Sequence, residues 1–571
     1  MQTLETDILI LGAGGAGLFA ALHAQKANPD LDVTIAVKGL LGKCGCTRMV
    51  QGGYNVALAA EDSVERHFMD TIEGGSWLNQ QDLAWLLVAT APKRIRELEN
   101  ELGCFFDRNP DGTVHQKAFA GQTFDRTVHK GDLTGIEIIN RLAEQVWRRA
   151  VRRLEDHRAI DLLPAHDGTG LAGVLLLDMR TGEPLLVRAR AVLLATGGGP
   201  TMYKYHTPSG DKSCDGMAMA LRAGLPLRDM EMVQFHPTGL LAGEDTRMTG
   251  TVLEEGLRGS GGWLTDSDGE RFMFAYDKRG ERATRDIVSR SIMDRIRAGF
   301  AAPHGGVYIE MGHLGPDNVR REFKGMVERC ADCGFDLAAG RVEVIPTAHY
   351  MMGGVVFSAD CTTPLPRLYA AGEDTGGVHG ANRLGGNGVA NSTVFGGLAG
   401  DAIAAQVRRA GALPEVDRAA LEAARARIEA PFGHALGDLD GIRRRLFDVM
   451  WADVGILRTA DGLARGQAAL DDLAGAVARA GVTGDRRYNL TWMDRLNLEN
   501  LVLVSRVICA AAIARTDSRG AHFREDFPHL SDLATSRYTV ARLAGGRPAI
   551  DTEPVVFTRV KPGETLLGQA A

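Results

Sequence analysis

The stretch DILILGAGGAGLFAALHA, at residues 7–24, decides the fold of this chain. An apolar run at 7–11 is typical of a buried strand, and a glycine-rich turn separates it from a run with helical spacing. Another apolar run at 33–37 predicts the second strand of a strand–helix–strand unit. Gly12, Gly14 and Gly17 fit the pattern G-x-G-x-x-G, which permits a tight turn, the approach of a pyrophosphate and close helix packing. The stretch therefore predicts a Rossmann-type dinucleotide-binding domain, the alternative being a glycine-rich turn without a ligand.

Two later transitions from strand to glycine predict a site at the edge of the same sheet. Apolar runs at 191–195 and 367–371 end in TGGG at 196–199 and in GE at 372–373. The carboxyl ends of such strands can converge on one ligand. The strand at 33–37 is followed by Lys38, where a standard NAD site has an acidic residue that binds the ribose. This departure argues against a standard NAD site and makes Glu373 a candidate for the ribose contact.

The order of segments predicts three structural units within 571 residues. We expect the dinucleotide-binding domain at 1–235 and 352–405, with an inserted α+β capping domain at 236–351. Runs rich in alanine and leucine at 419–427 and 463–480, and an apolar run at 500–514, predict helices. They indicate a helical C-terminal domain at 406–571 that ends in an irregular tail. The predicted fold class is α/β, with a Rossmann-type domain, a cap and this helical domain.

The composition excludes several classes of protein. The net charge of −7 is distributed along the chain, and no basic stretch indicates nucleic-acid binding. No apolar run approaches the ~20 residues of a membrane span and no signal-peptide pattern is present, so we expect a cytoplasmic protein without a transmembrane segment. The eight scattered cysteines fit that compartment. Cys330 and Cys333 form a C-x-x-C without a second pair, which favours a structural role over zinc, and we expect no metal site.

Five motifs in fixed order make the interpretation more specific. They are QGG at 51–53, TGG at 196–198, QFHPTG at 234–239, HGANRLGGN at 379–387 and SRGAHFRED at 518–526. Together they resemble the flavoprotein subunit of succinate dehydrogenase and fumarate reductase, over nearly the whole chain. That family also includes L-aspartate oxidase and adenylylsulfate reductase. The resemblance implies that the Rossmann-type domain binds FAD and that the chain is an FAD-dependent oxidoreductase.

The resemblance assigns proton transfer to three charged residues. In the family a hydride passes between the flavin N5 and a carbon–carbon bond of a dicarboxylate, while an arginine exchanges a proton on the opposite face. The matching arginine is Arg285, and Glu255 and Arg258 match a relay that serves it. Arginine has a pKa above about 12 in water, so it can act as an acid only in a water-poor site with a neighbouring carboxylate. Without the resemblance, a surface ion-pair cluster would be the simpler interpretation.

The resemblance also implies the residues that bind the substrate. His236, His349 and Arg383 match the family's ligands for the substrate carboxylates, and Phe119 matches an apolar wall against substrate and flavin. Arg383 offers a bidentate fork for one carboxylate. Histidines close to anions stay protonated more readily and add donors, although a lone histidine is more often structural. We therefore expect a small carboxylic acid as substrate.

The predicted FAD contacts are distributed over the motifs and the strand ends. They are Gly12, Gly14, Gly15, Gly17, Lys38, Cys46, Thr47, Gln51, Gly52, Gly53, Thr196, Gly197, Asp215, Glu373, Arg383, Gly388 and Val389. Succinate dehydrogenase links FAD covalently to a histidine that lies five residues before the QGG glutamine, in a His-Thr pair. Here that position is Cys46, followed by Thr47. We expect non-covalent FAD, with a thioether at Cys46 as the chemical alternative, and an absent link would favour reduction over succinate oxidation.

Glu254 is a departure from the family at the substrate site. The succinate and fumarate enzymes have Thr-Glu-Gly where this chain has EEG at 254–256, and their threonine donates a hydrogen bond to one substrate carboxylate. An ionised Glu254 cannot donate and would repel a second carboxylate by about 1–4 kcal/mol. The far end of the substrate is then an amine, a hydroxyl, an amide or a larger group, unless Glu254 points away from the site.

Three functions compete on these observations. The leading one is a dehydrogenase or reductase of the fumarate reductase and succinate dehydrogenase type, which works with an iron–sulfur partner and contacts a membrane only through that partner. The second is a flavin oxidase of a small acid, similar to L-aspartate oxidase. That subfamily has an acidic residue for the substrate amine in the stretch that matches FAG at 119–121, and this chain has none there. The third is a flavin-bearing scaffold without activity. The presence of Arg285, His236, His349 and Arg383 argues against the scaffold.

Overall fold

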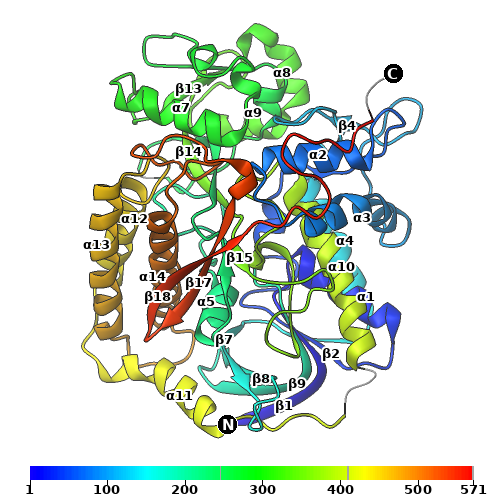
Figure 1. Ribbon diagram of the computed structural model, residues 1–571, viewed down its shortest axis with the longest axis vertical. Coiled ribbons are helices and arrows are strands. Elements are labelled where there is room, and N and C mark those ends of the chain that lie inside the picture. Colours follow the sequence, from blue (N-terminus) through cyan, green and yellow to red (C-terminus); the bar gives the residue numbers. More distant parts are fainter. Residues whose placement is uncertain (245, 408–410, 569–571) are drawn as a thin grey trace.

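A sheet of seven strands forms the main layer of the computed structural model, which describes residues 1–244, 246–407 and 411–568 (Figure 1). In its middle, β1 (Gln2–Leu11) pairs in parallel with β2 (Val33–Ala36) and β9 (Pro184–Leu194). The other strands are β6 (Val151–Leu154) beside β2, β16 (Leu368–Ala370) beside β9, and the antiparallel β8 (Leu171–Asp178) and β7 (His157–Pro164). The Rossmann-type α/β fold predicted from the glycine turn is confirmed.

The two faces of this sheet pack against different helices. Side chains alternate between the faces of a strand, so Ile8 and Ile10 of β1 lie on one side while Leu9 and Leu11 lie on the other. The first side packs against α1 (Gly15–Ala27), α3 (Gln81–Asn100), α4 (Thr134–Trp147) and α10 (Asn387–Val407). The second packs against α5 (Asp215–Arg222) and the C-terminal helices. The sheet is therefore buried on both faces, as its apolar strands predict.

Glycines bring α10 unusually close to α1. A Cβ atom at Gly396 would lie 2.6 Å from the carbonyl oxygen of Ala16, and one at Gly400 would lie 2.4 Å from that of Ala20. Any larger residue at either position would separate the helices. Gly396 lies in the third turn of α10 and Ala16 in the first turn of α1, so the earlier turns of α10 extend past the start of α1.

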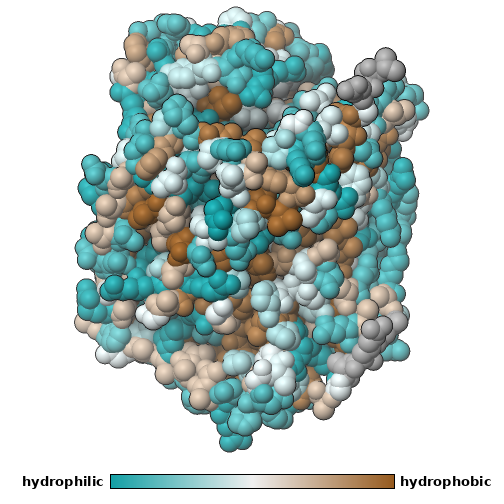
Figure 2. Space-filling view, viewed as in Figure 1, coloured by the Kyte–Doolittle hydropathy of each residue, from teal (hydrophilic) through white to brown (hydrophobic). Residues whose placement is uncertain are grey.

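The cap is a second, antiparallel sheet with its own hydrophobic core. Its strands are arranged in the order β11 (Val233–Leu240), β14 (Arg341–Met351), β13 (Val307–Glu310) and β12 (Trp263–Thr265). The helices that accompany them are α6 (Gly256–Gly259), α7 (Arg285–Arg297), α8 (Pro316–Glu322) and α9 (Lys324–Ala331). Cys330 is buried in this core and Cys333 packs against it. Figures 1 and 2 show the cap as a lobe at the top of the molecule with a mainly hydrophilic surface. The predicted boundaries at 236 and 351 stay a prediction.

The C-terminal region is helical and ends irregularly at 555–568, but a β-hairpin that we did not expect precedes this tail. Its helices are α11 (Arg418–Glu429), α12 (Leu439–Ala452), α13 (Ala460–Arg479) and α14 (Leu490–Ala514). A hairpin of β17 (Arg537–Ala544) and β18 (Arg547–Pro554) then joins β10 (Leu227–Arg228) and β15 (Gly354–Val355) in a four-stranded sheet. The turn is formed by Gly545 and Gly546, both with positive φ, and such a Gly-Gly pair is a hairpin signal. Prolines at 548 and 554 argued against a strand in this segment, so the hairpin was not predicted.

Helix α14 is long and apolar enough to cross a membrane by length and composition. In this fold it is a core helix, because 78% of its most apolar window is buried inside the molecule. It packs against α12, α13 and α5 on the second face of the main sheet. Its apolar character is therefore explained by internal packing.

Candidate active site

One cavity of about 440 Å³ runs along the edge of the main sheet and under the cap. It brings together segments that are far apart in sequence. Of the predicted site residues, those on its wall are Gly12, Gly14, Gly15, Lys38, Cys46, Thr47, Gln51, Gly52, Gly53, Phe119, Thr196, Gly197, Asp215, His236, Glu254, Glu255, Arg285, His349, Glu373, Arg383, Gly388 and Val389. Gly17 and Arg258 contact residues of this wall from behind it.

The glycine turn fits a pyrophosphate. Gly12 has a φ of +111°, and a Cβ atom there would lie 2.1 Å from the carbonyl oxygen of Ala195. At Gly17 a Cβ would lie 2.0 Å from the carbonyl oxygen of Gly12. At Gly14 it would meet only Thr47 Oγ1, at 3.5 Å, so this position faces open space at the start of α1. Two glycines therefore serve packing and the third leaves room for an anion at a helix N-terminus.

The part of the cavity next to the glycine turn also contains an unpaired polar atom and a protonated thiol. Gln51 Oε1 is buried and has no hydrogen-bond partner among the described residues. Thr47 Oγ1 accepts a hydrogen bond of 3.0 Å from the backbone of Gly15, which ties the segment around Thr47 to the start of α1. Burial raises the pKa of Cys46 to about 12, so its thiol is protonated at neutral pH. The unpaired oxygen of Gln51 leaves an acceptor for a donor of the cofactor.

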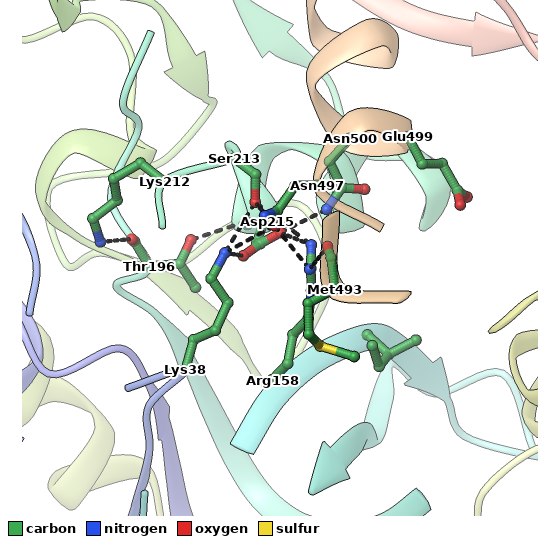
Figure 3. Close-up of polar contacts among 12 residues, drawn as sticks. Lys38, Arg158, Thr196, Lys212, Ser213, Asp215, Met493, Asn497, Glu499 and Asn500 are labelled. Atoms are coloured by element: carbon green, nitrogen blue, oxygen red, sulfur yellow. Dashed lines mark hydrogen bonds and ion pairs between the residues drawn. The ribbon is translucent and has the colours of Figure 1, made fainter. Parts of the chain in front are cut away.

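Lys38 and Asp215 form an ion pair at the end of β2. Lys38 Nζ lies 2.9 Å from Asp215 Oδ2, and further side chains surround the pair (Figure 3). Glu373, the predicted ribose contact, lies elsewhere on the wall, where its Oε1 accepts a hydrogen bond of 3.0 Å from the backbone of Met351. Burial raises the pKa of Glu373 to about 7. Asp215 is therefore the carboxylate next to Lys38, and a ribose contact of Glu373 stays a prediction.

The three predicted proton-transfer residues form one buried series. Arg285 Nη2 lies 2.5 Å from Glu255 Oε2, and Arg258 Nη2 lies 3.4 Å from Glu255 Oε1. Arg285 is the first residue of α7, and Glu255 precedes α6, which contains Arg258. Burial opposes ionisation of Glu255, but Arg285 and Arg258 outweigh it and lower its pKa. The side chains of Arg285, Glu255 and Arg258 are 7%, 2% and 0% exposed, so a surface ion-pair cluster is the wrong interpretation.

The two predicted histidines lie next to each other on adjacent cap strands. His236 is on β11 and His349 is on β14, and their ring centroids are 5.4 Å apart. Burial, and then the nearby Arg285, hold both pKa values well below the usual range, so each ring is neutral without an anion beside it. The backbone of Thr238 donates to His236 Nδ1 at 3.3 Å. A neutral His236 therefore has its proton on Nε2 and keeps one donor for a ligand.

The guanidinium group of Arg383 faces the cavity with several of its hydrogen-bond donors unpaired among the described residues. Its Nε has no partner among the described residues, and its Nη1 donates only a long bond of 3.4 Å to the carbonyl oxygen of Leu384. Burial lowers the pKa of Arg383 to about 10, so it is charged at neutral pH. Its guanidinium lies over the ring of Tyr350, 4.4 Å from the centroid, which holds its plane in place. A buried cation with free donors is suited to a carboxylate.

Comparisons with known proteins agree over the full length of the chain. The family model described as "FAD binding domain" matches residues 7–389, and the model described as "Fumarate reductase flavoprotein C-term" matches residues 443–566. This chain belongs to the succinate dehydrogenase/fumarate reductase family of flavoproteins. The predicted resemblance is confirmed, and the fold of an FAD-binding domain with a C-terminal helical domain is that of the family.

Proteins similar to this chain include fumarate reductases and Sdh1. One of them, from the fumarate reductase (CoM/CoB) of Methanothermobacter marburgensis, is 40% identical, over 92% of this chain and 95% of its own length. Quinol fumarate reductase FrdA of Escherichia coli, in a solved structure of a variant, has a TM-score of 0.93 at 32% identity and covers 100% of both chains. Sdh1 of Mycobacterium smegmatis has a TM-score of 0.86 at 35% identity, over 97% of this chain and 94% of its own.

Glu254, the position at which this member departs from the family motif, lies on the cavity wall. Its side chain is 3% exposed, and both carboxylate oxygens lie 3.3 Å from Lys117 Nζ. Lys117 belongs to β4 (Gln116–Lys117), a short strand of the FAD-binding domain, whereas Glu254 belongs to the cap. Burial raises the pKa of Glu254, and Lys117 opposes that effect. The cavity wall therefore contains a paired carboxylate where the family has a hydroxyl.

Several residues of this flavoprotein site are absent from the sequence-based prediction. Gln234 lies inside the QFHPTG motif and accepts a bond of 3.0 Å from Arg285 Nη1. Tyr350 follows His349 directly and lies under Arg383. Their places in or next to predicted site segments could have indicated them. Lys117 and Thr207 have no such signal, because they meet Glu254 and His349 only through the tertiary fold.

Proposed function

We propose that this chain is an FAD-dependent dehydrogenase or reductase that acts on the carbon–carbon bond of a small carboxylic acid, succinate, fumarate or a close analogue. The observation that carries the proposal is the buried series Arg285–Glu255–Arg258, which meets Arg383 on the wall of one cavity. When bound, FAD would supply or accept the hydride at its N5 atom. The family includes proteins named fumarate reductase that cover this whole chain, and their names support the reaction class.

Each residue has a role that follows from its contacts. Arg383 would hold one substrate carboxylate with its free donors, and His349 of β14, on the same cavity wall, would assist it. Arg285 would exchange a proton with the substrate carbon, because Glu255 bonds its guanidinium and can take up or return that proton. Arg258, buried behind Glu255, would stabilise the carboxylate charge. The burial of these groups keeps water away from the step.

A second substrate class is favoured by Glu254. An acid whose far end has an ammonium, hydroxyl or amide group could donate a hydrogen bond to this buried carboxylate, which a second carboxylate could not. An oxidase similar to L-aspartate oxidase would satisfy Glu254 only if the substrate ammonium, and not its second carboxylate, faces this residue. The two classes share the carboxylate on Arg383 and differ only in the group that faces Glu254.

We further propose that FAD is bound without a covalent link. The protonated thiol of Cys46 is a weak nucleophile, and this supports the proposal. Acid precipitation of the purified protein should release the flavin into the supernatant. Flavin that stays with the precipitated chain, with a mass shift on the Cys46 peptide, would contradict it.

We also propose that an iron–sulfur subunit exchanges electrons with this chain, and that the chain is cytoplasmic and reaches a membrane only through such a partner. Similarity to quinol fumarate reductase and to Sdh1 supports a partner subunit. Co-purification of the chain with the product of a neighbouring gene that has cysteine motifs for iron–sulfur clusters would test this.

The function is tested by anaerobic mixing of the reduced holoprotein with unsaturated acids. Fumarate, its monoamide and acrylate share one carboxylate and differ at the far end. Return of the oxidised flavin spectrum with at least one of them, and formation of the saturated acid, is the expected result. A flavin that stays reduced with all three acids, and is reoxidised only when oxygen is then admitted, would contradict the proposal and favour the scaffold or an oxidase of another substrate.

A further inference from the structure

Asp215 is the centre of a polar cluster that joins the FAD-binding domain to the C-terminal helices (Figure 3). Its Oδ1 accepts from three donors: Arg158 Nη2 at 2.8 Å, Ser213 Oγ at 2.8 Å and Asn500 Nδ2 at 2.6 Å. Its Oδ2 accepts from Lys38 Nζ at 2.9 Å. Burial opposes ionisation, but Arg158 and Lys38 outweigh it and hold the pKa of Asp215 well below its usual range. The carboxylate is therefore ionised, and its Oδ1 is saturated.

Two asparagines of α14 hold this cluster from behind. Asn497 Oδ1 accepts from Arg158 Nη1 at 2.8 Å and from Lys38 Nζ at 3.3 Å. It also lies 3.0 Å from Ser213 Oγ, whose single proton it shares with Asp215 Oδ1. Asn500 donates to Asp215, and its own Oδ1 accepts from Arg222 at 2.9 Å. Both side chains belong to buried residues, whereas Lys38, Ser213 and Asp215 lie on the cavity wall. In Figure 3 the asparagines reach the cluster from the helix, on the opposite side from Thr196.

The cluster lies where the adenosine half of a dinucleotide ends. Lys38 is the second residue after β2, and the end of this strand is the usual place of the acidic residue that binds the ribose. Here the strand supplies a lysine and the carboxylate comes from the first residue of α5. Asp215 Oδ2 has one donor among the described residues, so it retains acceptor capacity on the cavity side. A ribose hydroxyl or the adenine amino group can supply the missing donor.

We infer that Asn497 and Asn500 are positioning residues for the adenosine half of the cofactor. Asn500 completes the set of donors on Asp215 Oδ1. Asn497 fixes Lys38 and Ser213, which in turn hold Asp215, so that Asp215 Oδ2 is directed at the cavity. The C-terminal domain therefore contributes to cofactor affinity without lining the cavity at these positions. The inference rests on FAD as the cofactor of the proposed function.

Asn497 and Asn500 make different hydrogen bonds, so substitutions at the two positions should change FAD release in a pattern that a loss of stability would not produce. Asn497 acts as an acceptor, so Asn497→Asp keeps its bonds and Asn497→Leu removes them. Asn500 donates to a carboxylate, so Asn500→Asp places one carboxylate against another. Asn489→Ala is the matched control, because Asn489 caps α14 by accepting from Trp492 and lies outside the cluster.

The experiment measures the release of FAD from diluted holoprotein by flavin fluorescence, together with the thermal unfolding midpoint. We expect release to accelerate at least tenfold in Asn497→Leu and in Asn500→Asp, and less than threefold in Asn497→Asp. Asn489→Ala should lower the midpoint but keep the wild-type release rate. Equal release in all variants, or an effect that only follows the unfolding midpoint, would overturn the inference. A wild type that binds no FAD would instead contradict the proposed function.

Displacement by ADP tests which half of the cofactor is affected. ADP shares only the adenosine diphosphate half with FAD, so both ligands should lose the same factor of affinity in Asn497→Leu. The ADP concentration that displaces half of the FAD should then equal that of the wild type. A concentration that falls tenfold would mean that only FAD is weakened, which would place the effect at the flavin end and overturn the inference.

Discussion

The carboxylate of Glu254 and the ammonium of Lys117 face each other at 3.3 Å on the wall of the substrate cavity. If Glu254 is ionised, it opposes a second substrate carboxylate. Glu254→Thr should therefore tighten the binding of fumarate and malonate by about tenfold or more, since removal of ~1.4 kcal/mol of repulsion has that effect. Titration of the holoprotein, followed in the flavin spectrum, measures it. Tight binding by the wild type, with no gain in the variant, would show that Glu254 does not select the substrate.

The Lys117–Glu254 pair also predicts how fumarate binding depends on pH, and Lys117→Met tests this. Lys117→Met leaves Glu254 buried and unpaired, which raises the pKa of Glu254 further. The pH below which fumarate binding tightens should therefore move upward in this variant, and the shift should be absent in the Glu254→Thr background. Burial raises the pKa of Glu254, so the neutral, hydrogen-bond-donating form accumulates at a higher pH than for an exposed glutamate. Fumarate binding by the wild type should tighten as the pH falls, because the repulsion disappears. A pH dependence that Glu254→Thr retains would assign this effect to another group.

At the scale of elements, two glycines of the turn between β1 and α1 have different roles. Gly17 is needed for packing, and we expect Gly14 to be needed for binding the cofactor. Gly17→Ala forces a Cβ to 2.0 Å from the carbonyl oxygen of Gly12, so we expect a loss of about 1–3 kcal/mol in the free energy of unfolding. Gly14→Ala meets only Thr47 Oγ1 at 3.5 Å and has an ordinary φ of −79°, so the fold should persist. Its FAD affinity should nevertheless fall at least tenfold, because the methyl group occupies the path of the pyrophosphate.

Denaturant unfolding and flavin retention measure both variants on the same samples. A Gly14→Ala protein with wild-type FAD affinity would show that the pyrophosphate does not pass the second glycine. A fully stable Gly17→Ala protein would show that the helix can move away from the turn at little cost.

The elements that the sequence predicted share a local signal. The glycine turn, the flanking apolar strands and the QFHPTG and HGANRLGGN motifs are continuous in sequence, so they could be located before the fold was known. The pairs Lys117–Glu254 and Asn500–Asp215 join residues that are 137 and 285 positions apart, and no periodicity indicates them. The β17–β18 hairpin had a signal in Gly545 and Gly546, but its flanking prolines suggested an irregular tail.

At the scale of the molecule, the active site exists only where the units meet. Arg285, Glu255 and Arg258 belong to cap helices or their first turns, whereas Arg383 lies just before α10 of the FAD-binding domain. The C-terminal helix α14 reaches the same cavity from the opposite face of the main sheet, through Asp215. Cap, sheet and C-terminal helices would therefore position the proposed proton donor, the substrate and the cofactor relative to each other.

The most direct test of this account is a single anaerobic turnover of the Arg285 variants. The reduced holoprotein is mixed with an acid that reoxidises the wild type, and the return of the oxidised flavin spectrum is timed. We expect Arg285→Gln and Arg285→Lys to retain FAD and to reoxidise at least ~100-fold more slowly, because a positioned proton donor is lost. Arg282→Gln, an exposed change three residues away, should match the wild type. Reoxidation of Arg285→Gln within threefold of the wild type would remove Arg285 from the mechanism and contradict the account.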